Sequence, residues 1–365
     1  MITIDREGTV IDVLAPTDLN FLQQVEFYNG ILIPGMVNAH THLELSYLKG
    51  VIPEGGGFAG FAKGLRENRS RFSRDEIEHA IDYNAARMWA DGVQAVGDIC
   101  NGNSTFPVKT RSPLTSHSFV ELFGLNAGIR EAERAEMIRE EAVGAGLRAT
   151  VTPHATYSLN EEGFRFGVGD DDNSPLSIHF MESPGETELF EDRGEMKRWY
   201  DDAGFRTDFT PLYNSPAERV VALVPSTRKV LLVHNTMIGQ DEISVLKDHF
   251  GDNVTFVLCP RSNRYITGMA PPAELLRKNK VRVAVGTDSL ASNHSLSMID
   301  ELKTFGSIPL EELLRWATIG GAEALGLQDT LGSFEKGKRP GVVLLEGVDW
   351  SELALTPEAE TRRIV

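Results

Sequence analysis

Eight short apolar segments recur along this chain, and they constrain its fold more than any other feature. They occupy residues 36–40, 93–100, 118–125, 147–154, 176–180, 230–235, 254–260 and 281–289. Stretches with helical patterning lie between several of them, at 74–91, 130–145, 186–203, 240–250 and 271–279. Such an alternation indicates an α/β protein with a parallel sheet. Eight units predict a (β/α)8 TIM barrel over residues 34–329, and an open doubly wound sheet is disfavoured because no GxGxxG turn follows the first strand.

The two ends of the chain have a different character from the middle. In residues 1–33, apolar and polar residues alternate over short stretches that are separated by turn residues. Residues 330–365 contain the apolar run VVLL, flanked by Gly and Pro residues. Both patterns are typical of small β-strands. We therefore expect the ends to combine into one small β-domain that flanks the barrel.

Charge and composition exclude several classes of partner. The 36 Lys and Arg residues against 53 Asp and Glu residues give a formal net charge of −17. Such a surface repels nucleic acids and anionic membranes. The two cysteines suit a reducing compartment, and the N-terminus shows no apolar signal segment. We expect a cytoplasmic protein with a small-molecule substrate and with neither nucleic acid nor membrane as a partner.

Polar side chains gather at the carboxyl ends of the apolar segments. The residues in question are His40, His42, His154, His179, His234 and Asp288. Catalytic groups of barrel enzymes come from this face. His40 and His42 are two residues apart, so both point the same way from a strand and can face one metal ion. The alternative for such a pair is two half-buried histidines that are hydrogen-bonded within a loop.

Five segments, in this order, resemble the amidohydrolase superfamily, in particular its branch of cytosine-deaminase-like aminohydrolases and chlorohydrolases. They are PGMVNAHTHLELS (34–46), PHATYS (153–158), HFMESPGE (179–186), CPRSN (259–263) and GTDSLASN (286–293). The resemblance spans nearly the whole chain and implies that the two ends form a β-sandwich. It also implies the metal ligands, which would be His40, His42, His179 and Asp288. His234 would contact the metal-bound water, and Glu182 would be the proton shuttle.

The residue types are compatible with these roles but leave alternatives. Glu182 stands where a helix begins, so it is either a proton-transfer group or an acidic residue at a helix start. Asp288 follows a buried strand and needs a metal, a histidine or backbone N–H groups as a partner, or it caps the next helix. Three histidines and one aspartate suit Zn²⁺ best, and Fe²⁺ or Mn²⁺ accept the same ligands. Binuclear relatives carry a bridging lysine at the end of the fourth strand. Residues 147–158 contain no lysine, so we expect one ion.

Further residues are predicted to bind the substrate. By resemblance to nucleoside-deaminating relatives, His154 contacts the substrate, with Tyr157 beside it. The HTHLE pattern that contains Glu44 also occurs in aminodeoxyfutalosine deaminases, whose ligand is an adenine nucleoside, although Glu44 is equally well a structural carboxylate. Asn263 can reach the pocket from the seventh strand. A second set is expected around the site, with Ser262 reaching the pocket and Ser289 and Asn293 steadying Asp288.

The segment 47–72 is rich in glycine and contains three phenylalanines, Phe58, Phe61 and Phe72. Long loops that follow barrel strands often close over the site, so these rings either stack on a flat substrate or only pack against the barrel.

The favoured function is hydrolytic deamination of a purine, a nucleoside or a related amino-heterocycle by a metal-activated water. The alternatives are hydrolysis of a C–Cl bond or a cyclic amide on the same scaffold, and a non-catalytic metal-binding protein. The presence of both Glu182 and Asp288 disfavours the last, because binding alone does not need both. Barrels of this kind commonly form dimers, so we expect either a homodimer or a monomer.

Overall fold

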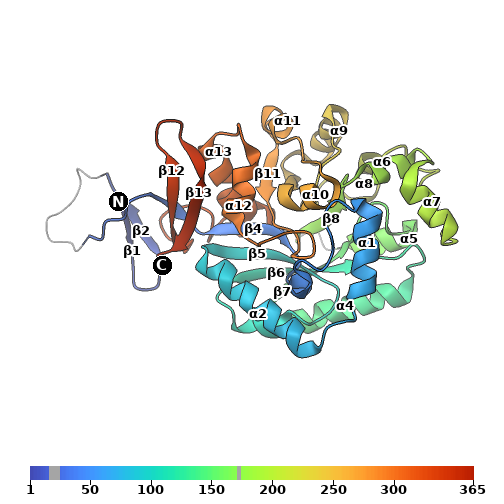
Figure 1. Ribbon diagram of the computed structural model, residues 1–365, viewed down its shortest axis with the longest axis horizontal. Coiled ribbons are helices and arrows are strands. Elements are labelled where there is room, and N and C mark those ends of the chain that lie inside the picture. Colours follow the sequence, from blue (N-terminus) through green and yellow to red (C-terminus); the bar gives the residue numbers. More distant parts are fainter. Residues whose placement is uncertain (16–24, 171–173) are drawn as a thin grey trace.

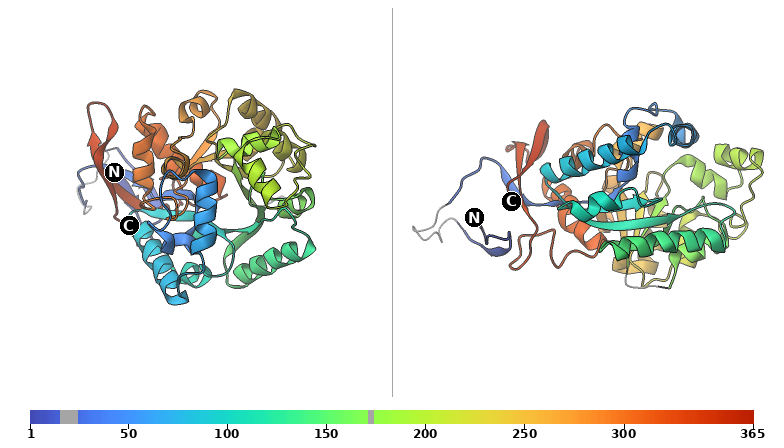
Figure 2. Two further views of the ribbon diagram at one scale, coloured as in Figure 1. Left: turned by 45° about the vertical axis from the view of Figure 1, so that its right-hand side comes forward. Right: turned by 90° about the horizontal axis from the view of Figure 1, so that it is seen from below.

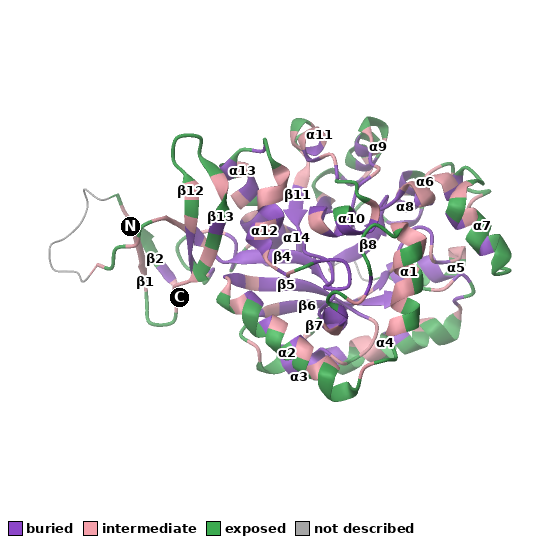
Figure 3. Ribbon diagram, in the orientation of Figure 1, coloured by how far each residue is buried: buried purple, intermediate pink, exposed green. Residues whose placement is uncertain are grey.

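Figure 1 shows the computed structural model of the protein, which describes residues 1–15, 25–170 and 174–365. Residues 16–24, part of the predicted N-terminal β-domain, lie outside the described residues. Strands occupy the centre and helices surround them, as the two further views in Figure 2 make clear. The burial map of Figure 3 shows the same layering, with buried strands inside and exposed outer helix faces. Within the described ranges, no helix is both long enough and apolar enough to cross a membrane.

Two four-stranded parallel sheets carry the centre of the molecule. The first contains, in spatial order, β4 (Met36–Thr41), β5 (Val93–Cys100), β6 (Thr115–Leu122) and β7 (Arg148–Pro153). The second contains β8 (Leu176–Phe180), β9 (Val230–His234), β10 (Val254–Leu258) and β11 (Arg282–Val285). Isolated parallel bridges join their edges, between Thr41 and Asp288 and between Ala155 and His179. Neighbouring strands therefore end on the same side, which gathers the residues that follow them.

Helices between the strands cover the sheets. They are α2 (Arg74–Ala90), α3 (Phe106–Arg111), α4 (Ile129–Gly144), α5 (Glu161–Val168), α8 (Pro216–Leu223), α9 (Gln240–Phe250), α11 (Ala273–Lys278), α13 (Leu310–Arg315) and α14 (Gly321–Ala324). Additional helices follow strand ends and comprise α1 (Gly57–Asn68), α6 (Pro184–Phe190), α7 (Gly194–Asp202), α10 (Pro260–Thr267) and α12 (Met298–Leu302). The sequence sets their limits locally. Ser73, for example, begins α2: its hydroxyl accepts a hydrogen bond from the Glu76 N–H, and its backbone N–H donates to the Glu76 carboxylate.

The two chain ends lie on one side of the parallel sheets (Figure 1). β3 (Ile31–Pro34), β12 (Val342–Asp349) and β13 (Ala354–Arg363) form an antiparallel sheet with β12 in the middle. β1 (Ile2–Ile4) and β2 (Val10–Val13) form a separate hairpin. The Val10 N–H donates to the Lys338 carbonyl, which ties this hairpin to the C-terminal segment. The division of the chain into two domains stays a prediction.

Several expected elements differ from the observed ones, and the strand expected at 281–289 is the shorter β11. The helix expected at 186–203 is two helices, α6 and α7. Asp192 between them and Gly194, the first residue of α7, have φ of 54° and 90°, which the interior of a right-handed helix does not allow. The strand expected at 118–125 runs from Thr115 to Leu122. Gly124, with φ of 127°, turns the chain after it. This shift moves Glu121 to the end of the strand.

Candidate active site

Three imidazoles converge where the strands end. His40 and His42 come from the end of β4, and their Nε2 atoms are 3.2 Å apart. His179, from β8, joins them, so that one nitrogen from each ring lies within 4.8 Å of the others. All three side chains are buried. The strand alternation that places residues two apart on one face therefore produces a compact nitrogen cluster.

Asp288 completes this cluster from the end of β11. Its Oδ1 lies 3.3 Å from Nε2 of His42 and 3.7 Å from Nε2 of His40. Its Oδ2 accepts hydrogen bonds from the hydroxyls of Ser262 at 2.5 Å and Ser292 at 2.9 Å. One carboxylate oxygen is thus fixed by hydroxyls, and the other faces the histidines.

The electrostatics favour a carboxylate among neutral imidazoles. Burial by itself would raise the pKa of Asp288, but a hydrogen bond with His40 and the electrostatic influence of the nearby imidazoles of His42 and His234 hold that pKa well below its ordinary value. Burial lowers the pKa of His179 to about 4 and that of His42 well below its ordinary value. These are the protonation states that a metal ion requires of its ligands.

Hydrogen bonds fix which nitrogen of His179 faces the cluster. Its Nδ1 lies 2.8 Å from the backbone carbonyl oxygen of His154 and donates to it. The lone pair of Nε2 is then left free to face inward. The same carbonyl accepts from the His179 backbone N–H, so the strand bridge and the ring orientation depend on each other.

Glu182 and His234 form a second pair beside the cluster. Glu182 lies in the turn after β8, and its Oε1 is 3.7 Å from Nε2 of His234. Burial, with the neighbouring charges of Asp288 and Glu186, raises the pKa of Glu182 well above its ordinary value, against a hydrogen bond from Tyr157. Nδ1 of His234 lies 3.2 Å from the amide nitrogen of Asn263. Nε2 of His234 is buried and makes no hydrogen bond within the described part of the chain.

The donor set fits a divalent metal ion. Three imidazole nitrogens lie within 4.8 Å of one another, and the Asp288 carboxylate lies within 3.7 Å of two of them. This N/O combination is that of catalytic zinc sites and of related transition-metal sites. The orphaned Nε2 of His234 adds a buried polar atom that needs a partner there. β7 carries no lysine that would bridge a second ion.

The four residues predicted to bind substrate lie around this cluster in different ways. The ring of His154 is 4.7 Å from that of His179, and the ring of Tyr157 is 6.1 Å from that of His154. Asn263 is engaged with His234. The Glu44 carboxylate accepts from the backbone N–H and the amide of Asn101, at 2.9 and 3.0 Å, and is buried.

A profile described as the amidohydrolase family matches residues 31–361. The chain belongs to this family. An adenosine deaminase from Helicobacter pylori is 30% identical over 326 residues, which cover 86% of this chain and 78% of that protein. A 5'-deoxyadenosine deaminase from Methanothermobacter thermautotrophicus is 24% identical over 384 residues, which cover 94% of this chain and 80% of that protein.

Solved structures agree with this membership. Helicobacter pylori aminofutalosine deaminase in complex with methylthio-coformycin aligns with a TM-score of 0.82 and 28% identity, over 95% of this chain and 87% of that one. The atrazine chlorohydrolase TrzN from Arthrobacter aurescens, at 18% identity and a TM-score of 0.78 over 99% and 87% of the two chains, shares the fold. The protein is therefore a metal-dependent hydrolase that acts on C–N bonds.

The amidohydrolase site contains residues that the sequence analysis missed. Glu121, at the end of β6, is buried, and its Oε1 lies 3.4 Å from Nδ1 of His179. Burial raises the pKa of this carboxyl to about 8. The amide of Asn101 donates both to Glu121 and to Glu44, so the two carboxylates share one donor. The signal for Glu121 was a glutamate inside the apolar run SFVELFGL. The sequence analysis placed the end of this strand at residue 125 instead of Leu122, and this concealed the signal.

The surroundings of Asp288 also differ from the prediction. Ser262 binds Asp288, whereas Ser289 reaches it only through Ser292. The amide of Asn293 donates to Glu301 and to the backbone carbonyl of Thr287, the residue before Asp288, so Asn293 contacts the backbone beside Asp288 and not its carboxylate. Ser292 was not singled out because a serine four residues after the aspartate carries no distinctive pattern.

The three phenylalanines of the segment 47–72 divide between the two expected roles. Phe61 and Phe72 pack in a hydrophobic cluster with leucines of the preceding loop. Phe58 instead lies edge-on to Tyr157, with the ring centres 5.4 Å apart. Of these three rings, that of Phe58, at the beginning of α1, contacts a residue predicted to bind the substrate.

Proposed function

We propose that this amidohydrolase hydrolytically deaminates an adenine nucleoside or a closely related amino-heterocycle. The observation that carries the proposal is the position of Glu182, which lies beside the histidine cluster without belonging to it. Its carboxyl, with the pKa raised by burial, suits a group that donates a proton to a ring nitrogen. The curated relatives named adenosine deaminase and 5'-deoxyadenosine deaminase point to the same substrate class.

The metal ligands in this proposal are His40, His42, His179 and Asp288, holding one ion, for which Zn²⁺ is the best match. A divalent ion supplies a Lewis acid that makes water a nucleophile at neutral pH. The carboxylate of Asp288 accepts the proton of the attacking water, since one of its oxygens faces the site while hydroxyls fix the other. The Nε2 atom of His234 orients that water, and Asn263 holds the His234 ring.

Glu182 then moves the proton that deamination requires. In its neutral form it donates to the ring nitrogen next to the amino-bearing carbon, which makes that carbon more electrophilic. The hydroxide left from the water adds to this carbon. Asp288 passes the proton it accepted to the amino group, the C–N bond breaks and ammonia leaves, and the added O–H gives its proton to the Glu182 carboxylate, which restores both groups. His154 and Tyr157 contact the substrate, and Glu44, held by Asn101, shapes the pocket wall.

We also propose the finer architecture that this chemistry needs. The two parallel sheets close into one (β/α)8 barrel, supported by the bridges at both edges, and the chain ends form a small β-sandwich. A closed barrel brings β4, β8, β9 and β11 to one mouth.

A substrate panel tests the function. We expect ammonia release from adenosine or 5'-methylthioadenosine, measured by a coupled assay and by the loss of adenine absorbance. Guanine, a pterin and a chlorotriazine serve as comparisons. Chloride release from the triazine without ammonia from any amino-heterocycle would overturn the proposal.

A further inference from the structure

A second glutamate, Glu186, lies one helical turn after Glu182, in the first turn of α6, and its side chain is fully buried. Its Oε2 accepts a hydrogen bond from the backbone N–H of Glu182 at 3.0 Å, and the N–H of Met181 also donates to this carboxylate. The hydroxyl of Thr156 donates to the other oxygen, Oε1. The carboxylate of Glu186 therefore joins the turn that carries Glu182 to the loop after β7.

The turn after β8 has an unusual backbone. Met181 has a φ of 48°, in the left-handed region that residues other than glycine seldom adopt. Such a conformation persists only where the surrounding contacts hold it in place. The Met181 carbonyl accepts from the N–H of Met237 at 2.9 Å, and the N–H groups of Met181 and Glu182 donate to Glu186. Because this backbone sets the direction of the Glu182 side chain, the contacts with Glu186 help to aim it.

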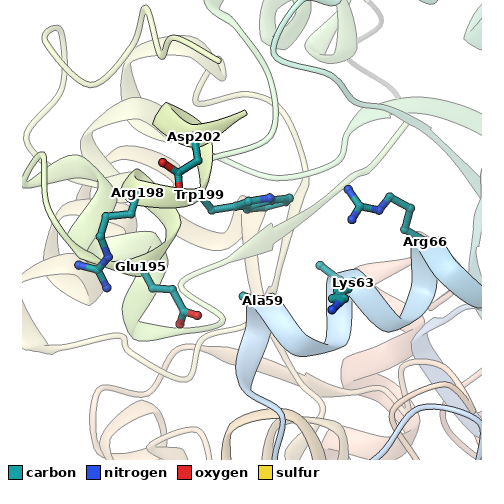
Figure 4. A pocket seen from close by; sticks show the side chains of 8 residues that line it. Ala59, Lys63, Arg66, Glu195, Arg198, Trp199 and Asp202 are labelled. Carbon is teal, nitrogen blue, oxygen red and sulfur yellow. The ribbon is translucent and has the colours of Figure 1, made fainter. Parts of the chain in front are cut away.

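The outer side of the same turn borders open space. A cavity of about 230 Å³ is lined there by Ser183, Pro184 and Gly185, among others. A larger cleft of about 660 Å³ lies beside it, between α1 and α7, and Figure 4 shows the indole of Trp199 extending into it. Side-chain packing on this side therefore holds the turn incompletely. The hydrogen bonds to Glu186, on the inner side, have to supply the rest.

The loop after β7 is a firm anchor for these hydrogen bonds. Arg219 of α8 is fully buried, and its guanidinium donates to the carbonyl oxygen of Thr156 at 2.5 Å. Tyr157, the next residue, makes a hydrogen bond with the side chain of Glu182. Neighbouring residues of one loop thus contact both glutamates, and the loop and the turn are fixed relative to each other.

A similar sequence begins another helix and shows what is particular to Glu186. ESPGE (182–186) leads into α6, and NSPAE (214–218) leads into α8. At α8 the Oε2 of Glu218 accepts from the backbone N–H of Asn214 at 2.7 Å, as Glu186 does from Glu182. Glu218 is exposed, and it also accepts from the side-chain amide of Asn214. A helix start accounts for Glu218, but it does not account for the burial of Glu186 or for its bond with Thr156.

We propose that Glu186 is a positioning residue for the deamination and that it acts through Glu182. Its carboxylate, held by Thr156, fixes the turn so that the Glu182 carboxyl faces the ring nitrogen of the substrate. Metal binding and substrate binding do not depend on this contact. The inference rests on the proposed function, because it takes Glu182 as the proton-transfer group, and it deepens that function by naming what aims this group.

Glu186→Met tests the proposal. Methionine has nearly the same size as glutamate but is a poor acceptor, so the two N–H groups and the Thr156 hydroxyl lose their partner. Because a small displacement of a catalytic group lowers the rate strongly, we expect kcat for adenosine to fall by about ten- to a hundredfold. KM should stay within about twofold of the native value, and the metal content should not change. Glu186→Gln still accepts from the N–H groups and should lose less kcat than Glu186→Met.

Thr156→Val provides a second route, which decides the question if Glu186→Met does not fold. Valine keeps the shape of threonine and removes the hydroxyl, so kcat should again fall while KM stays nearly constant. Thr156→Ser keeps the hydroxyl and should retain native kcat. The matched control is Glu218→Met, which removes the equivalent hydrogen bond at the start of α8. It should lower Tm without changing kcat.

Combining Glu186→Met, or Thr156→Val, with Glu182→Gln shows whether the effect passes through Glu182. Once the acidic proton is absent, the second substitution should cause little further loss of kcat. Losses that multiply in the double variant overturn the inference, as does loss of metal, or native kcat in both Glu186→Met and Thr156→Val. The proposed function stands in these cases if Glu182→Gln alone removes the activity. If Glu182→Gln keeps native kcat, or if no adenine nucleoside releases ammonia, both proposals fall.

Discussion

Replacing Glu182 with glutamine isolates proton transfer from metal binding. The side chain is only 5% exposed, and its Oε1 lies 3.7 Å from Nε2 of His234, so a glutamine of nearly the same size fits the same space. It has no acidic proton to donate. Loss of general acid catalysis lowers the rate by about 10² to 10⁴, or roughly 3 to 5 kcal/mol in the activation free energy. We expect kcat for adenosine to fall by that factor, in steady-state assays of ammonia release.

We expect the Glu182→Gln variant to keep the stability and the metal content of the native protein although its activity falls. The pKa of Glu182 is raised in the folded state, so its contribution to stability is complete below the ordinary pKa of 4.5 and is lost as pH rises. Glutamine never ionises, and the Glu182→Gln variant should therefore have a Tm at pH 7 at least equal to that of the native protein. Glu191→Gln, at an exposed position after α6, is the control and should retain full activity. Refutation would be a variant that keeps more than a tenth of the native kcat, or one that loses its metal.

Two buried groups away from the metal cluster give further predictions. Burial lowers the pKa of His117 to about 3 from an ordinary 6.5, so the folded state loses stability as pH falls from 6.5 toward 3, by about 2 kcal/mol at pH 5. His117→Gln should flatten this pH dependence in urea unfolding, and an unchanged slope would contradict the cause. Lys109→Met breaks a buried ion pair with Asp98, whose atoms are 2.5 Å apart, and should cost about 3 to 5 kcal/mol of unfolding free energy. Adding Asp98→Asn should restore part of this loss in chemical denaturation, and no recovery would mean that pairing is not its source.

Much of the fold and of the histidine cluster could be predicted because strand periodicity and strand ends are local features of the sequence. The pattern in which His40 and His42 alternate at the end of an apolar run predicts both a direction and a location. The pair Lys109 and Asp98 could not be found this way, since a lysine from a short helix reaches back to the preceding strand. Such pairing depends on tertiary packing.

The same reason explains the misplaced Glu121. The apolar run continued past the strand, and only the backbone turn at Gly124 shows where pairing stops. The break between α6 and α7 also depends on residues with a left-handed backbone conformation. Asp192 is one of them, and an aspartate in a sequence does not by itself indicate this conformation. Both cases mark limits of periodicity, which locates a strand or a helix better than its end.

Metal content measured together with ammonia release tests the central claim most directly. The protein is purified, its metal is quantified by plasma mass spectrometry, and adenosine turnover is followed through chelation and stepwise return of Zn²⁺. We predict one divalent ion per chain, loss of turnover on its removal, and recovery that saturates at one equivalent. Ammonia release that persists undiminished in the fully metal-free protein would contradict the account.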